Sequence, residues 1–164
     1  MKRQLASLAV AATSLAAAAN AMAADKIAQF NRGIGVDPVA GISAGTPVPN
    51  TVLGVPPGGR PWVIRKLRAS VYADGTISVN GAGLLFSGGD LIGTRGTIAA
   101  VKATLFCGGV GLDSPPGDLD LAGDFKIRGS LGAVPNPCNA PVLLIRSVGG
   151  NWFAAGIPSS DDDD

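Results

Sequence analysis

The clearest pattern of hydrophobic and polar positions lies in residues 97–109 (TIAAVKATLFCGG). In an extended chain, the odd-numbered residues from Ala99 to Cys107 would lie on one face and the even-numbered residues on the other. The pair Gly108-Gly109 then ends the run, as glycines commonly do at the end of a strand. We therefore predict a central β-strand whose last inward-facing side chain is that of Cys107.

Runs of a similar kind recur in the second half of the chain, separated by turn residues. They cover residues 62–72, 76–80, 118–128, 141–148 and 152–157. Residues 73–75 (ADG) and 149–151 (GGN) are typical of tight hairpins, and residues 122–124 (AGD) can divide the third run into two strands. Short strands separated by turns at intervals of about 8–12 residues favour sandwiches and small barrels. We predict an all-β fold, a single antiparallel β-sandwich, Ig-like or small barrel-like, of about six to seven strands.

The run 62–72 contains one position that breaks the alternation. Arg65 falls on the face that is otherwise apolar, and we expect its long side chain to reach the rim of the sheet. The inward-facing residues predicted for this run are Val63, Leu67, Ala69 and Val71.

Before residue 62 the chain has a different character, because proline and glycine alternate with single apolar residues. Residues 24–32 form a short polar entry, which is expected to be either one helical turn or a short edge strand. Prolines exclude a central strand over residues 33–61, because proline removes backbone donors. This stretch is either a flexible linker or an extended segment that lies across the sheets, and its apolar content favours the segment. The side chains of this segment that are expected to pack against the sheets are Val48, Val52, Leu53 and Val55.

The first 23 residues have the features of a secretory signal peptide. Lys2 and Arg3 precede an apolar run from Leu5 to Ala19, and an Ala-x-Ala site ends at Ala23. The alternative is an uncleaved anchor, but the run is short and rich in alanine for a membrane helix, which needs about 20 strongly apolar residues. We predict a signal-peptide helix, cleavage after Ala23, and a bacterial protein that is periplasmic or extracellular, with no membrane span in the mature chain. The predicted segments are then 1–23 (signal peptide), 24–61 (extended segment), 62–158 (β-sandwich) and 159–164 (acidic tail).

The two cysteines, Cys107 and Cys138, are predicted to form a disulfide. An even number of cysteines in an exported protein usually means a bridge, and the alternative is a pair of buried free thiols. Closing a loop of about 31 residues would add roughly 3–4 kcal/mol to stability.

The composition argues against catalysis and against a nucleic-acid partner. Histidine is absent, which removes the commonest general base and the usual zinc ligand. Removing Lys2 and Arg3 from the 13 basic residues leaves 11 against 12 acidic residues, so no charge excess points to nucleic acid. The glycine-rich residues 87–96 do not follow a strand-to-helix pattern and contain no phosphate-binding motif. We expect a protein that is not an enzyme and uses no cofactor.

An aromatic and basic strand is the first candidate binding site. Tryptophan or tyrosine could stack on a sugar or anionic ligand while arginine donates hydrogen bonds. The alternative is an outward face on which charges aid solubility and discourage edge pairing. The candidate residues are Trp62, Arg65, Lys66, Arg68 and Tyr72, with Arg60 beside them.

A group of aspartates is the second candidate site. Carboxylate oxygens and loop carbonyls could form an oxygen shell for Ca²⁺, although the spacing matches no EF-hand. The favoured interpretation is that these are solvated residues of turns and strand edges, with no metal bound. The candidates are Asp113, Asp118, Asp120 and Asp124.

Three stretches, VPPGGRPWVIRKLRASVYADG, ATLFCGG and NPCNAPVLLIRS followed by NWFAAGIP, resemble a set of small exported bacterial proteins. The Val-Pro-Pro opening and the alternating strands also show a distant similarity to chordin-like (CHRD) domains. That similarity implies a secreted β-sandwich, although this chain lacks the histidine-containing motifs of such domains. The expected function is a secreted, non-enzymatic structural or interaction module at or outside the cell envelope, with a protein or glycan partner. Binding of a small ligand or glycan, and a Ca²⁺-stabilised module, are the alternatives.

Overall fold

The computed structural model describes residues 24–159, and within this range the fold is all-β with no helix. The predicted signal peptide and residues 160–164 of the predicted acidic tail lie outside the described residues. The strands are β1 (Lys26–Gly35), β2 (Val39–Ser43), β3 (Thr46–Pro49), β4 (Trp62–Val63), β5 (Lys66–Tyr72), β6 (Thr76–Ala82), β7 (Leu85–Phe86), β8 (Ala100–Cys107), β9 (Val110–Asp113), β10 (Gly117–Asp118), β11 (Phe125–Ser130), β12 (Val142–Ser147) and β13 (Trp152–Pro158).

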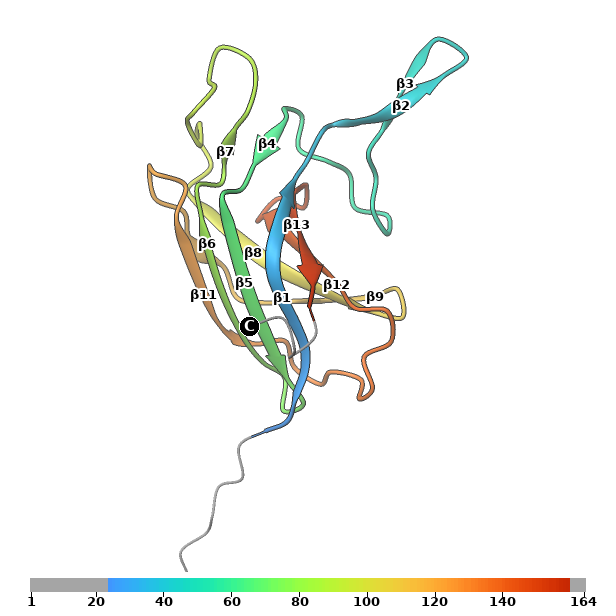
Figure 1. The fold of residues 1–164 in the computed structure, drawn as a ribbon, viewed down its shortest axis with the longest axis vertical. Helices are drawn as coiled ribbons and strands as arrows, with labels where there is room; N and C mark the ends of the chain where they lie inside the picture. The colour runs from blue at the N-terminus through green and yellow to red at the C-terminus, as the bar shows by residue number, and fades with distance from the viewer. Residues whose placement is uncertain (1–23, 160–164) are drawn as a thin grey trace, which may run out of the picture.

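Nine of these strands form one curled antiparallel sheet (Figure 1). Its order is β10-β8-β12-β13-β1-β5-β6-β11, and β9 adds to the side of β8. The two ends of the sheet meet, because β10 lies against β11 and Leu119 bridges to Phe125. Two small sheets, β2-β3 and β4-β7, complete the fold. The predicted antiparallel sandwich or small barrel is confirmed, although the strands are more numerous than the six or seven expected.

The strand predicted from residues 97–109 is β8, and it lies inside the sheet between β12 and β10. Val101, Ala103 and Leu105 are completely buried and Cys107 is nearly so, which confirms the predicted inward face. The opposite face is also covered at Thr104 and Phe106. This strand is therefore buried on both sides at its C-terminal end, where the disulfide begins.

Of the two alternatives predicted for residues 24–32, the strand is correct, but it is neither short nor at an edge of the sheet. These residues are part of β1, a ten-residue strand that pairs with β5 on one side and β13 on the other. Phe30 is fully buried, and the register shifts just after it. The sheet therefore begins at Lys26 and not at Trp62, and the boundary predicted at residue 62 falls inside the domain.

The prediction for residues 33–61 is correct for only part of the stretch. Val55 is buried and Val52 is partly buried, but Val48 and Leu53 are exposed. Val48 is exposed because residues 39–49 pair with each other and not with the main sheet, and Leu53 is exposed because it lies in the tight turn closed by the Val52–Val55 bridge. Figure 1 shows this hairpin, β2-β3, standing away from the barrel.

The run predicted over residues 62–72 is broken into β4 and β5. Leu67, Ala69 and Val71 face the core as predicted, whereas Val63 is 48% exposed and its neighbour Trp62 is buried. The alternation changes phase between the two strands, at the position of Arg65, whose side chain is exposed as expected at a rim. The turns predicted at residues 73–75, 122–124 and 149–151 all connect strands in the structure.

Candidate functional site

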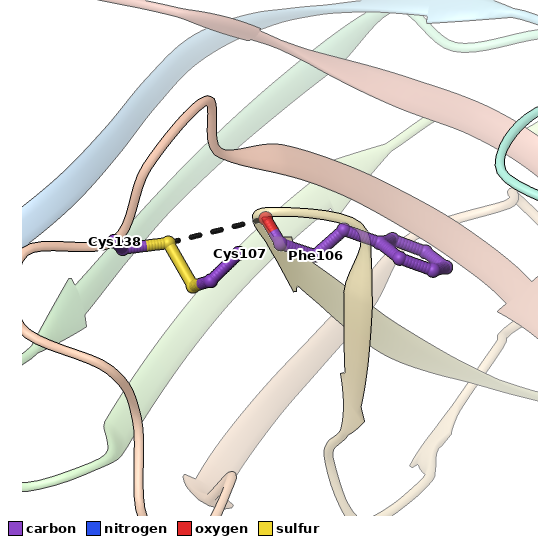
Figure 2. Close-up of a disulfide and its surroundings, with 3 residues drawn as sticks. All are labelled: Phe106, Cys107 and Cys138. Atoms are coloured by element: carbon purple, nitrogen blue, oxygen red, sulfur yellow. Dashed lines mark hydrogen bonds between the residues drawn. A yellow bond between two sulfur atoms is a disulfide. The ribbon is translucent and has the colours of Figure 1, made fainter.

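The predicted disulfide is present between Cys107 and Cys138 (Figure 2). The two Cα atoms are 4.9 Å apart, and the Cys138 sulfur lies 3.9 Å from the carbonyl oxygen of Phe106. Beside the bridge, the Gly108 amide donates a hydrogen bond to the Asn139 carbonyl at 2.7 Å. Since the sequence contains two cysteines, the bridge uses both, and cysteine has a structural role here.

The predicted aromatic and basic site does not assemble as a stacking platform. Trp62 is only 3% exposed and lies between the rings of Phe86 and Phe153, with centroid distances of 4.3 and 4.2 Å. Tyr72 is at the far end of β5, about 20 Å along the strand from Lys66. Arg65, Lys66 and Arg68 are exposed, but the structure does not bring all five candidates into one groove.

The structure does bring members of the two predicted sites together. Lys66 lies in a groove of about 550 Å³ with three of the candidate aspartates, and Phe125 lies at its floor. The groove forms where β6 pairs with β11, in a register that sets Phe125 opposite Gly81. Its charged and amide side chains are those of Lys66, Asn80, Asp118, Asp120, Asp124 and Lys126.

Two of these aspartates hold the turn before β11. Asp120 Oδ1 accepts hydrogen bonds from the backbone amides of Ala122 and Asp124, at 2.9 and 2.8 Å. Asp124 Oδ1 accepts one from the Gly83 amide at 2.9 Å and lies 3.7 Å from the Arg65 guanidinium. Within residues 24–159, no three or more acidic, histidine or cysteine side chains are grouped to hold a metal ion.

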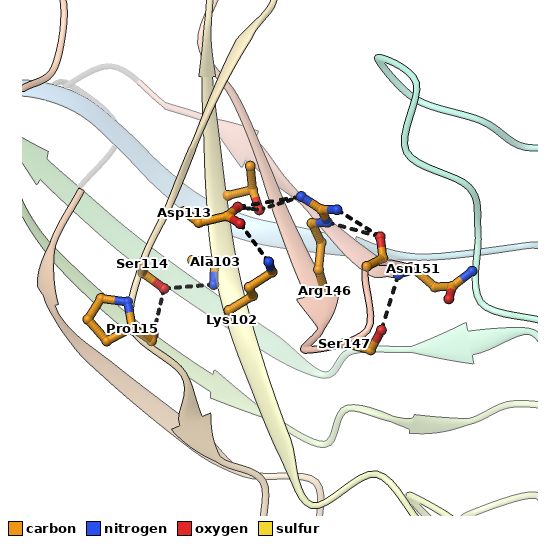
Figure 3. Close-up of polar contacts among 10 residues, drawn as sticks. Lys102, Ala103, Asp113, Ser114, Pro115, Arg146, Ser147 and Asn151 are labelled. Atoms are coloured by element: carbon orange, nitrogen blue, oxygen red, sulfur yellow. Dashed lines mark hydrogen bonds and ion pairs between the residues drawn. The ribbon is translucent and has the colours of Figure 1, made fainter. Parts of the chain in front are cut away.

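The fourth candidate, Asp113, belongs to a separate cluster on β8, β9 and β12 (Figure 3). Its carboxylate accepts hydrogen bonds from Lys102 Nζ at 2.5 Å and Thr104 Oγ1 at 2.6 Å, and the Arg146 guanidinium lies 3.4 Å away. Arg146 also donates from Nε and Nη2 to the Gly150 carbonyl, at 3.1 and 2.9 Å. The cluster therefore ties the β12-β13 turn to the outer side of β8.

This cluster lowers the pKa of Asp113. Burial alone would raise the pKa, but hydrogen bonds from Lys102 and Thr104 and the positive charges of Lys102 and Arg146 outweigh it. An acid with a lowered pKa in the folded state stabilises the fold above its unfolded pKa, near 4, and loses that contribution as the pH falls.

We expect Asp113→Asn to flatten the acid limb of the stability profile. In urea unfolding at pH 7, the variant should be less stable than the wild type by about 1 kcal/mol, a value limited by the partial exposure of the cluster. The difference should shrink as the pH falls below about 4, because the stabilisation from a carboxylate with a lowered pKa is lost as the pH falls through that pKa. Asp74→Asn, a change in the exposed β5-β6 turn, is the control for losing one acidic charge. A constant difference between pH 7 and pH 3 would contradict the assignment.

The β2-β3 hairpin, which we call the arm, is the most unusual surface of the molecule. All nine residues of its two strands are exposed, and none of the residues from Pro38 to Gly59 is charged. Ile42 is the most exposed large apolar residue of the arm, at 75%. The sequence signal for the arm was this long uncharged stretch, which the prediction assigned to packing against the sheets.

The base of the arm is fixed to the barrel through Asn50. The Asn50 amide donates to the Pro38 carbonyl and its side-chain Nδ2 donates to the Asp37 carbonyl, both at 2.9 Å. In turn, the Asn50 carbonyl accepts a hydrogen bond from Trp152 Nε1 at 2.8 Å. Because Trp152 is buried, the arm leaves the barrel in a defined direction.

Comparisons with known proteins do not place the chain in a family. No protein-family model matches the sequence, no curated protein matches it significantly, and no solved structure matches its fold significantly.

Among the described residues, there is no helix with the length and hydrophobicity needed to cross a bilayer.

Proposed function

We propose that this protein is a secreted, non-enzymatic interaction module that associates with a second copy of itself through the arm. The observation that carries the proposal is an uncharged hairpin, exposed over its whole length and fastened at its base. The disulfide supports a location outside the cytoplasm, because such bridges persist in oxidising compartments. The absence of histidine from the sequence and the use of both thiols in the bridge support a non-catalytic role.

A hairpin of two strands is marginally stable when nothing covers it. In the arm, β2 and β3 pair only with each other, so each has one open edge. An open strand edge is a template for a further strand, and proteins usually block it with charge or proline. An additional strand would therefore stabilise the arm.

The two edges of the arm differ in how well they are blocked. Pro47 and Pro49 interrupt β3, because proline cannot donate a backbone hydrogen bond. In β2, Val39–Ser43, there is neither proline nor charge. Two copies of β2 can pair antiparallel about a two-fold axis, which is the closed arrangement favoured by most homodimers.

The size of this edge determines the expected affinity. A stable interface of standard size buries about 800 Å² on each partner, and a contact built on one five-residue strand is smaller. We therefore expect a reversible dimer, with a dissociation constant in roughly the micromolar range.

Sedimentation velocity over a range of concentrations tests this proposal. The wild type should shift from monomer to dimer as its concentration rises, whereas Ile42→Lys should stay monomeric to at least about tenfold higher concentration, because lysine protects an edge strand. At concentrations at which both proteins are monomeric, their melting temperatures should be the same, because Ile42 is exposed and outside the core.

The matched control is Val110→Lys, which places the same charge on an exposed residue of β9. This variant should dimerise like the wild type. A wild type that remains monomeric at millimolar concentration would contradict the proposal, and so would an Ile42→Lys variant that dimerises normally. Loss of the dimer in Val110→Lys alone would assign the interface to β9.

A further inference from the structure

A second hollow, which we call the aromatic cleft, lies at the end of the barrel where β4, β7 and β13 meet. Its volume is about 370 Å³, within the range of about 300–1,000 Å³ usual for small-molecule sites. The floor is apolar and consists of Trp62, Phe86, Ile98 and Phe153. Gly58 keeps it open, since a Cβ there would lie 2.9 Å from the Phe153 ring and 3.0 Å from Trp62 Nε1.

Arg60 is the one charged residue among those that line the aromatic cleft. Its guanidinium carbon lies 5.7 Å from the centroid of the Phe86 ring, and Nη1 is next to Gly89, where an added Cβ would be 2.6 Å away. None of the ion pairs found among the described residues uses this guanidinium. A cation is thus held at the mouth of an apolar hollow with no carboxylate bound to it.

The other polar groups of the aromatic cleft, Ser147 and Asn151, are uncharged and add hydrogen-bonding capacity to the positive charge of Arg60. Ser147 Oγ accepts a bond from the Asn151 amide at 3.1 Å, which leaves the hydroxyl hydrogen free to donate. Asn151 Nδ2 is already committed to the Pro57 carbonyl at 2.9 Å, so its amide orientation is fixed. Arginine and serine together match an anionic oxygen, because arginine donates two parallel bonds to a carboxylate.

We propose that the aromatic cleft binds small carboxylates that carry a flat apolar group. The apolar group would pack on the partly exposed side chains of Phe86 and Ile98, above the buried rings of Trp62 and Phe153, and the carboxylate would accept hydrogen bonds from Arg60. This site is separate from the arm, so it does not depend on self-association.

The two tryptophans of the sequence make a specific test possible, because each gives one indole N–H signal in NMR spectra. Trp62 Nε1 borders the aromatic cleft, whereas Trp152 Nε1 is bonded to Asn50 at the base of the arm. Titration with 2-naphthoate should move the Trp62 signal and leave the Trp152 signal in place. Acetate, which lacks the ring, and 2-naphthylmethanol, which lacks the charge, should each bind at least about tenfold more weakly.

Arg60→Gln should weaken 2-naphthoate binding by about tenfold, because it removes the charged hydrogen-bond donor. Arg128→Gln is the matched control, since Arg128 is exposed on β11 and outside the lining of the aromatic cleft, and binding should stay at the wild-type level. An unchanged Trp152 signal in both variants will show that the fold is intact. The proposal is overturned if 2-naphthoate leaves the Trp62 signal unmoved, if Arg60→Gln binds it normally, or if both substitutions weaken it equally.

Discussion

Replacement of Cys107 and Cys138 by alanine should lower the free energy of unfolding by about 3–4 kcal/mol. The bridge joins residues 31 apart, and in the chain-entropy account it restricts the unfolded chain far more than the folded one. The native sheet does not depend on the bridge for its register, because Phe106 already pairs with Val142 across β8 and β12. A loss of this size is a large part of a total stability of about 5–15 kcal/mol, so the unbridged protein should be marginal.

Urea unfolding at pH 7, with and without dithiothreitol, measures this contribution. Reductant should lower the stability of the wild type to that of the double alanine variant, which should itself be insensitive to reductant. This internal control separates loss of the bridge from the small cavities left by two truncated side chains. Equal stability of the oxidised wild type and the double variant would show that the bridge contributes little.

The sequence pattern predicted strands and turns correctly where the local preference of the residues agrees with their burial in the folded sheet. In β8, Val101 and Leu105 alternate with less apolar residues, and the same alternation decides which face is buried. The β5-β6 turn carries Asp74-Gly75, a pair that readily adopts positive φ, and its position was predicted correctly.

The alternation of hydrophobic and polar residues did not predict the full length of β1, because what this strand buries depends on the side chains of its neighbours. In β1 few inward positions carry large side chains, because Gly33 and Gly35 leave room for Leu67 and Trp62. The arm was missed for a local reason. Its two-residue turn has positive φ at both Ala44 and Gly45, and alanine gives no sign of such a turn.

The candidate sites were harder to predict than the strands. The groove unites Lys66 with Asp118 and Asp120 because β5, β6 and β11 are neighbours and β10, which carries Asp118, lies against β11; the sequence alone does not specify that order. The aromatic cleft depends on Trp62 being buried beside Phe153, two residues far apart in the chain. Residue type indicated which side chains could bind a ligand, but the pairing of the strands determines which of these side chains lie close together.

Gly35 lies at the crossing that positions both the arm and the aromatic cleft, and we expect Gly35→Ala to be strongly destabilising. It pairs with Ala154 of β13, and an added Cβ would overlap the carbonyl oxygen of Trp62 and lie 2.6 Å from the Val63 Cα atom. These are backbone atoms, so no change of rotamer can make room, and β4 would have to separate from β1. Overpacking of this kind costs about 1–3 kcal/mol, and the backbone contacts place Gly35→Ala at the upper end of that range.

The matched control is Gly41→Ala in the arm, where an added Cβ has no neighbour within 4 Å. Its effect on stability should stay within about 0.5 kcal/mol.

In urea unfolding followed by tryptophan fluorescence, Gly35→Ala should lower the urea concentration at the midpoint of unfolding. It should also shift the native emission, because Trp62 follows β4 when that strand moves. If the two glycine variants were equally stable, the close approach of β4 to β1 would not be a rigid feature of the fold. In that case, the direction of the arm and the shape of the aromatic cleft would have to be set by Asn50 and Trp152 alone.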